Sequence, residues 1–149
     1  MRVVLAFFIL MMVAFAAAQN ANHDLKVSIP SVLILKLSNS NDQETVPVAI
    51  EVKGESYQIN PTQTQIEVMA NRDWSLSASY QAASQADAQA KLMWRSSAEW
   101  QRFGYADSII ASGSQTSGWH KLQVDYKLDT PLPPSGTYQG LITYTLTRP

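Results

Sequence analysis

The residues best suited to chemistry in this chain are two histidines, a scatter of acidic residues and four tryptophans. A histidine acting as general base needs an oriented nucleophile and a supporting carboxylate. No Gly-x-Ser-x-Gly elbow supplies such a nucleophile. His23 lies in a polar lead-in, and His120 follows Trp119 at the start of a predicted strand. We interpret both as surface or loop histidines and predict no catalytic residue and no enzyme activity.

The acidic residues suggest two other kinds of site. Pairs such as Glu51/Glu55 and Asp125/Asp129 have the chemistry of a glycosidase, which needs two carboxyl groups roughly 5–10 Å apart. Single acids on polar strand faces are more often solvated, which is the interpretation we favour. The segment from Asn39 to Glu44 offers oxygen ligands for Ca²⁺ but lacks the spacing and glycine of an EF-hand, so a polar turn is predicted. Because cysteine is absent, thiolate metal sites and disulfides are excluded, and we expect no metal and no cofactor.

The aromatic residues are the strongest candidates for binding. Trp94, Trp100 and Trp119 fall outside clean alternation and near polar loops, and Tyr105 lies in the same irregular stretch. Exposed aromatics of this kind stack on sugar rings or anchor a protein partner, although they can equally cap the ends of a sandwich. We predict Trp94, Trp100, Trp119 and Tyr105 as binding residues. Trp74 and Tyr144, in contrast, lie on alternating apolar faces and are predicted to be in the core.

Short strands must position these residues. Apolar side chains alternate with polar ones over residues 46–52, 74–80, 122–128 and 138–146, which is the period of a half-buried strand. Seven or more such strands, with turns every 8–12 residues, predict an all-β, antiparallel immunoglobulin-like β-sandwich. Residues 82–92 are rich in Ala and Gln and break the pattern, so either a short helix or a loop insertion fits there. The segment from Val27 to Leu37 is apolar at consecutive positions after Pro30, as in a strand buried on both faces.

The start of the chain predicts export. Arg2 is followed by an unbroken apolar run from Val3 to Phe15 and by three alanines ending at Ala18, the pattern of a cleavable signal peptide over residues 1–18. The run is shorter than the roughly 20 residues of a membrane-spanning helix; a retained anchor is the alternative and would also place the domain outside. Residues 19–149 fit one β-sandwich domain. We expect a secreted, cell-surface or periplasmic protein with no membrane span after cleavage.

The charges are few and scattered singly along the chain. Eleven Lys and Arg residues face 12 Asp and Glu residues, for a formal net charge of −1. This dispersion predicts no basic face and hence no nucleic-acid partner.

The C-terminal strand pattern resembles that of a known surface-protein family. Gly136, Tyr138, Gly140, Ile142, Tyr144 and Leu146 alternate here, and the pattern is similar to the closing strand of the WxL surface domains. Trp74-Ser75-Leu76 resembles the first Trp-x-Leu motif of that family, and Tyr144-Thr145-Leu146 stands in place of the second, with Tyr replacing Trp. The resemblance covers residues 66–149 with gaps. It implies a β-sandwich displayed at the cell surface that associates with peptidoglycan or with partner surface proteins.

A second resemblance is to spore-coat-protein-U-like domains and chaperone–usher pilus subunits, which end in a similar Gly-x-Tyr-x-Gly strand. In the pilus subunits an opening apolar strand completes a neighbour's sheet, and the strand from Val27 to Leu37 would take that part in self-assembly. Together these features predict an exported cell-envelope protein that recognises a wall polymer or a surface partner through loop aromatics or a strand edge. The alternative is a surface-filament subunit assembled by donor-strand exchange.

Overall fold

A computed structural model describes residues 27–38, 44–104 and 106–149. The chain divides into two units, Met1–Pro30 and Ser31–Pro149. Within the first unit only residues 27–30 are described, and they form no strand. The predicted signal peptide over residues 1–18, His23, most of the turn from Asn39 to Glu44, and Tyr105 lie outside the described residues. None of the helices in the described part is long and apolar enough to cross a membrane.

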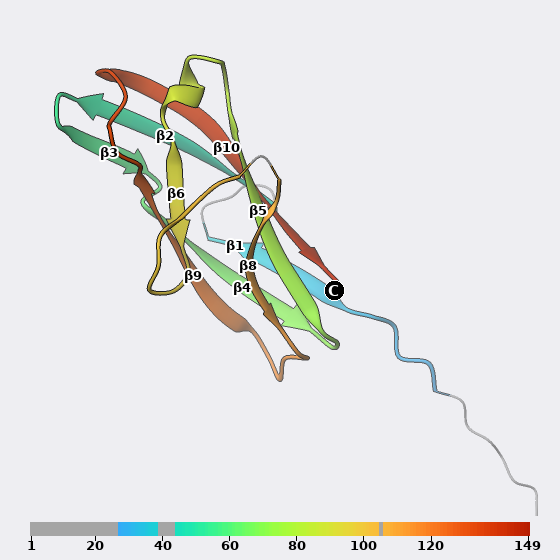
Figure 1. Ribbon diagram of the computed structural model, residues 1–149. Coiled ribbons are helices and arrows are strands. Elements are labelled where there is room, and N and C mark those ends of the chain that lie inside the picture. Colours follow the sequence, from blue (N-terminus) through green and yellow to red (C-terminus); the bar gives the residue numbers. More distant parts are fainter. Residues whose placement is uncertain (1–26, 39–43, 105) are drawn as a thin grey trace, which may run out of the picture. The chain divides into compact units, whose positions relative to one another are not determined.

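The second unit consists of two five-stranded antiparallel sheets, which confirms the predicted antiparallel β-sandwich (Figure 1). Sheet A has the order β1 (Leu33–Leu37), β4 (Gln63–Ala70), β9 (His120–Leu128), β6 (Leu92–Arg95) and β7 (Gln101–Arg102). Sheet B has the order β3 (Ser56–Asn60), β2 (Thr45–Lys53), β10 (Gly136–Thr147), β5 (Trp74–Ala82) and β8 (Ser108–Gly113).

Period-two alternation builds the core between the sheets. In β2 every second side chain, from Val46 to Val52, is buried, while those between are exposed or half-buried. Ile66 from sheet A and Leu76 and Ile142 from sheet B are fully buried in the same cluster. Because successive side chains of a strand point to opposite faces, the same alternation fixes which residues form the outer face of each sheet.

The residues that carry the WxL-like pattern lie next to one another in sheet B. β5 and β10 are antiparallel neighbours, and their register sets Leu76 opposite Leu146 and Tyr144 opposite Ala78. Trp74 is buried, and its indole N–H donates a hydrogen bond to the carbonyl of Ser114 at 2.9 Å. The prediction that Trp74 and Tyr144 belong to the core is confirmed.

The ambiguous segment over residues 82–92 contains one 3₁₀ turn, Asp87–Gln89, between the end of β5 and the start of β6. The Asp87 carboxylate fastens this turn to β10. It accepts hydrogen bonds from the Ser84 hydroxyl at 2.5 Å and from the Gln139 N–H at 2.7 Å. These bonds, the Ser84 hydroxyl first, hold the pKa of Asp87 below its usual value.

The prediction of a doubly buried strand from Val27 to Leu37 is wrong in two respects. The strand begins only at Leu33, and Leu35 is its one fully buried side chain. β1 lies at the edge of sheet A and pairs only with β4. Sheet B covers only one face of sheet A, so the outward-pointing Ile34 is 37% exposed. A run of consecutive apolar residues therefore marks an edge strand here.

Candidate ligand-binding face

The outer face of sheet A, the side chains of its strands that point away from the core, gathers most of the charge found in strands. Five basic and two acidic strand residues lie on it: Lys36, Arg95, Arg102, Lys121 and Lys127, with Glu67 and Asp125. The described strands of sheet B carry only Glu51 and Lys53, which pair with each other at 2.7 Å. The charges that are scattered along the sequence are thus concentrated on one face, where basic strand residues outnumber acidic ones.

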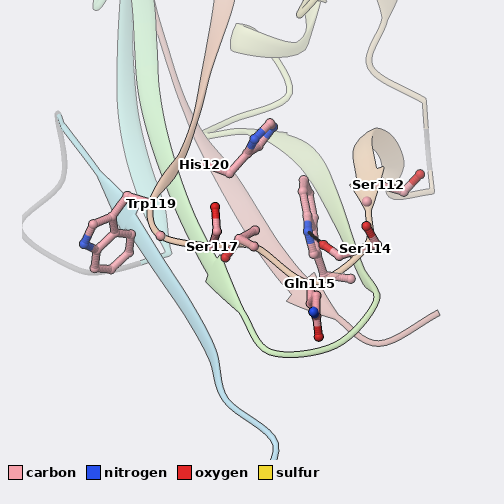
Figure 2. A pocket seen from close by; sticks show the side chains of 10 residues that line it. Ser112, Ser114, Gln115, Ser117, Trp119 and His120 are labelled. Atoms are coloured by element: carbon pink, nitrogen blue, oxygen red, sulfur yellow. Dashed lines mark hydrogen bonds between the residues drawn. The ribbon is translucent and has the colours of Figure 1, made fainter.

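Trp119 lies at one end of this face. It directly precedes β9, and the Lys36 ammonium, which points outward from β1, lies 4.0 Å from the centre of its indole ring. Trp119 and His120 point to different sides of the chain where β9 begins (Figure 2). Trp119 is half-buried, so part of its ring surface is free for contact.

A polar hollow of about 430 Å³ adjoins Trp119 (Figure 2). It is formed by the loop between β8 and β9, whose exposed side chains include Ser114, Gln115 and Ser117. The loop is held in place at Thr116, whose hydroxyl accepts a hydrogen bond from the Ala70 N–H at 3.0 Å. The hollow therefore offers hydroxyl and amide groups next to the chain at Trp119, whose indole points away from them (Figure 2).

Trp100 lies toward the other end of the face. The Arg95 guanidinium is 4.6 Å and the Lys127 ammonium 4.7 Å from the centre of its ring. Both cations point outward, from β6 and β9 respectively. Like Trp119, Trp100 is half-buried.

Three of the five basic side chains on this face form ion pairs. Arg95 pairs with Asp125 at 3.1 Å, Lys121 with Glu67 at 3.4 Å and Arg102 with Asp129 at 2.5 Å. Within the described ranges, Lys36 and Lys127 have no carboxylate within 4.0 Å, and each lies instead over a tryptophan.

Glutamines fill the middle of the face. The register places Gln65 of β4 opposite Gln123 of β9, and Gln63 opposite Asp125. The Gln123 amide donates a hydrogen bond to the Asp125 carboxylate at 2.7 Å. Amides both donate and accept hydrogen bonds, so this surface can bind hydroxyl groups.

The structure brings together two of the four predicted binding residues. Trp100 and Trp119 share the outer face of sheet A, while Tyr105 lies outside the described residues. Trp94 is a wrong prediction, because it is only 2% exposed and packs against Phe103 at 6.3 Å between ring centres. It points inward from β6, which lies between β9 and β7, so its position in an irregular stretch of sequence was a misleading signal.

The candidate catalytic and metal residues do not converge. His120 is exposed, with its ring 5.6 Å from that of Trp74. Asp125 and Asp129 each bind an arginine. No cluster of three or more His, Cys, Asp or Glu side chains suited to a metal is present among the residues that were placed.

Sequence reasoning missed Lys36, Arg95 and Lys127 as members of the site. The alternation of the strands does predict that each of these side chains points outward, since each lies next to a buried residue. Recognising them requires knowing that β1, β9 and β6 belong to one sheet, which the strand order alone reveals. Comparisons of the chain with protein-family models, with curated proteins and with solved structures find no match.

Proposed function

We propose that the protein is an exported cell-envelope component that binds a wall polymer across the outer face of sheet A. The observation that carries this proposal is the placement of Trp119 and Trp100 on one face. The chain from Trp119 to Lys127 is extended along β9, which separates their Cα atoms by about 26 Å at about 3.3 Å per residue, and Trp100 lies against Lys127. An extended polymer can contact both rings at once.

The chemistry of the face suits a glycan. An indole presents a broad apolar surface, against which the C–H face of a sugar ring can pack. The glutamines between the two tryptophans can exchange hydrogen bonds with sugar hydroxyls, and the polar hollow beside Trp119 adds further partners. The predicted signal peptide supports an encounter with such a polymer outside the cytoplasm.

Cosedimentation of the purified chain, residues 19–149, with insoluble peptidoglycan tests the proposal. Trp100→Ala and Trp119→Ala should each reduce the bound fraction while leaving the melting temperature within a few degrees of the parent. Tyr57→Ala is the matched control, because Tyr57 is an aromatic residue of sheet B that is 38% exposed. Equal binding by all three variants and the parent would refute a role for this face.

A second candidate function is the filament subunit assembled by strand exchange. The edge position of β1 and the exposure of Ile34 favour it. Among the described strands, however, β10 lies between β2 and β5 and each sheet is continuous. An incoming strand would therefore pair at a sheet edge, and β1 offers the most apolar one.

A further inference from the structure

We infer that the polymer is an anionic glycan, whose carboxylate, phosphate or sulfate groups bind at Lys36 and Lys127. This inference rests on the proposed function and names the class of ligand. It is carried by the two lysines of the face that have a tryptophan and no carboxylate partner within the described ranges.

Each lysine is held where a bound sugar would need it. Packing of the ammonium against the indole, at 4.0 Å for Lys36 and 4.7 Å for Lys127, fixes the charge next to the ring. A lysine ammonium carries three hydrogen-bond donors, and the ring faces can engage none of them as strongly as an anion does. A sugar contacting the free part of either indole would bring an acidic substituent within reach of the lysine.

The acidic residues on the face also limit how closely the anionic groups of a bound polymer can be spaced. Glu67 stands directly opposite Lys36 in the register of β1 and β4, and Asp125 lies two residues before Lys127 on the same face of β9, but each carboxylate forms its ion pair with another basic residue, Lys121 or Arg95. Each strand of a DNA duplex carries a phosphate about every 3.4 Å of the helix axis, and a nucleic acid laid along this face would press phosphates against both carboxylates. A glycan with separated acidic groups avoids that repulsion, which is why we favour a glycan over a nucleic acid.

Three matched pairs of polymers test the inference: polygalacturonate and its methyl ester, carboxymethyl and hydroxyethyl cellulose, and dextran sulfate and dextran. Within each pair the polysaccharide backbone is shared and the substituents differ in charge; carboxymethyl cellulose of low substitution is the polymer whose acidic groups are most widely separated. Affinity electrophoresis or calorimetry should show binding to the charged member of at least one pair, at least about tenfold tighter than to its neutral counterpart, and weakening as salt screens the charges.

Substitutions of the two lysines make the test specific. Lys36→Met and Lys127→Met keep the aliphatic contact with the ring and remove the charge. Each should weaken binding of the charged polymer about threefold to fivefold, the scale of one solvent-exposed ion pair. Lys53→Met is the matched control, because Lys53 lies on sheet B, and it should leave binding unchanged.

The outcomes separate this inference from the proposed function. Equal binding of charged and neutral polymers, lost in Trp100→Ala and Trp119→Ala but kept in both lysine variants, would overturn the anionic ligand and leave the glycan-binding face intact. Failure to bind any of the six polymers or peptidoglycan would overturn both. Tighter binding of a single-stranded DNA oligonucleotide than of every glycan would replace the glycan with a nucleic acid.

Discussion

Three buried hydroxyl groups join the two sheets at the centre of the sandwich. The Tyr126 hydroxyl of β9 donates a hydrogen bond to Thr64 Oγ1 of β4 at 2.8 Å and is also bonded to the hydroxyl of Tyr144 on β10. Each hydroxyl can both donate and accept, so one chain of bonds in which Tyr144 donates to Tyr126 and Tyr126 donates to Thr64 satisfies all three oxygens. Thr64 and Tyr144 are fully buried, so no water competes for these groups and each depends on its protein partner.

Removing the middle hydroxyl should cost more than removing the end one. Tyr126→Phe breaks both bonds and removes the shared partner of two buried hydroxyls, those of Thr64 and Tyr144, which costs about 1–3 kcal/mol for each group left unsatisfied. Tyr144→Phe breaks one bond and leaves Tyr126 still paired with Thr64. Urea unfolding followed by tryptophan fluorescence should rank Tyr126→Phe as the less stable variant, with the double variant less destabilised than the sum of the two. An additive double variant would show that the hydroxyls do not form one cluster.

The same cluster predicts a loss of stability in alkali. Burial raises the pKa of Tyr126 and, still more strongly, that of Tyr144 above the ordinary 10.0. Below pH 10 both the folded and unfolded states keep these protons, so the contribution is constant. Above pH 10 the unfolded tyrosines ionise while the folded ones stay protonated, and the free energy of unfolding falls by up to about 1.4 kcal/mol per pH unit for each.

Urea midpoints measured from pH 8 upward would check this alkaline slope. The Tyr126→Phe/Tyr144→Phe double variant is the control, because the remaining lysines and tyrosines titrate alike in both proteins. Its midpoint should fall less steeply above pH 10. Identical slopes for the parent and the double variant would contradict burial as the cause.

At the scale of elements, alternation in the sequence predicts the central strands well and the edges poorly. β2, β5, β9 and β10 follow their expected inward and outward positions because each is covered on one face by the opposite sheet. β1 and Trp94 departed from expectation because strand order, which is not encoded locally, decides what covers them. Trp100 and Trp119 were predicted as binding residues because they lie in irregular stretches of the sequence. Their lysine neighbours could not be predicted, because Lys36 and Lys127 come near the tryptophans only through the order of the strands.

β10 contains two glycines, Gly136 and Gly140, which occupy equivalent positions in the sequence pattern but have different surroundings in the structure. A Cβ added to Gly140 would fall inside van der Waals contact with the ring of Tyr80, whereas one added to Gly136 would lie 3.8 Å from the nearest atom of Tyr138. Gly140→Ala should therefore destabilise the fold by about 1–3 kcal/mol through overpacking. Gly136→Ala should change the free energy of unfolding little. Equal effects in urea unfolding would mean that Tyr80 moves aside without cost.

At the scale of the whole molecule, the two outer faces differ in chemistry. The face of sheet A is charged and aromatic, while over β5 and β10 the face of sheet B is built mainly of Ser and Thr, including Ser75, Ser77, Thr143 and Thr145. In a protein with a formal net charge of −1, the outer face of sheet A thus holds two lysines that form no ion pair among the described residues. This asymmetry favours a single orientation on an anionic polymer, and charge attraction would speed the encounter at low salt.

The state of assembly separates the binding protein from the filament subunit. Sheet edges that resist pairing are short, irregular or charged, and two of the four edges fit: β7 has two residues, and the pairing of β8 with β5 shifts register near Leu76. The β3 edge is five residues long and carries no charged residue. At the β1 edge Lys36 disfavours pairing while the exposed Ile34 favours it.

We expect residues 19–149 to be monomeric from about 1 to 100 µM, with a urea midpoint independent of concentration, as measured by light scattering and fluorescence. Oligomers or heat-resistant ladders that disappear in Ile34→Lys and persist in Ile109→Lys, a control at the exposed Ile109 of β8, would instead establish assembly through β1.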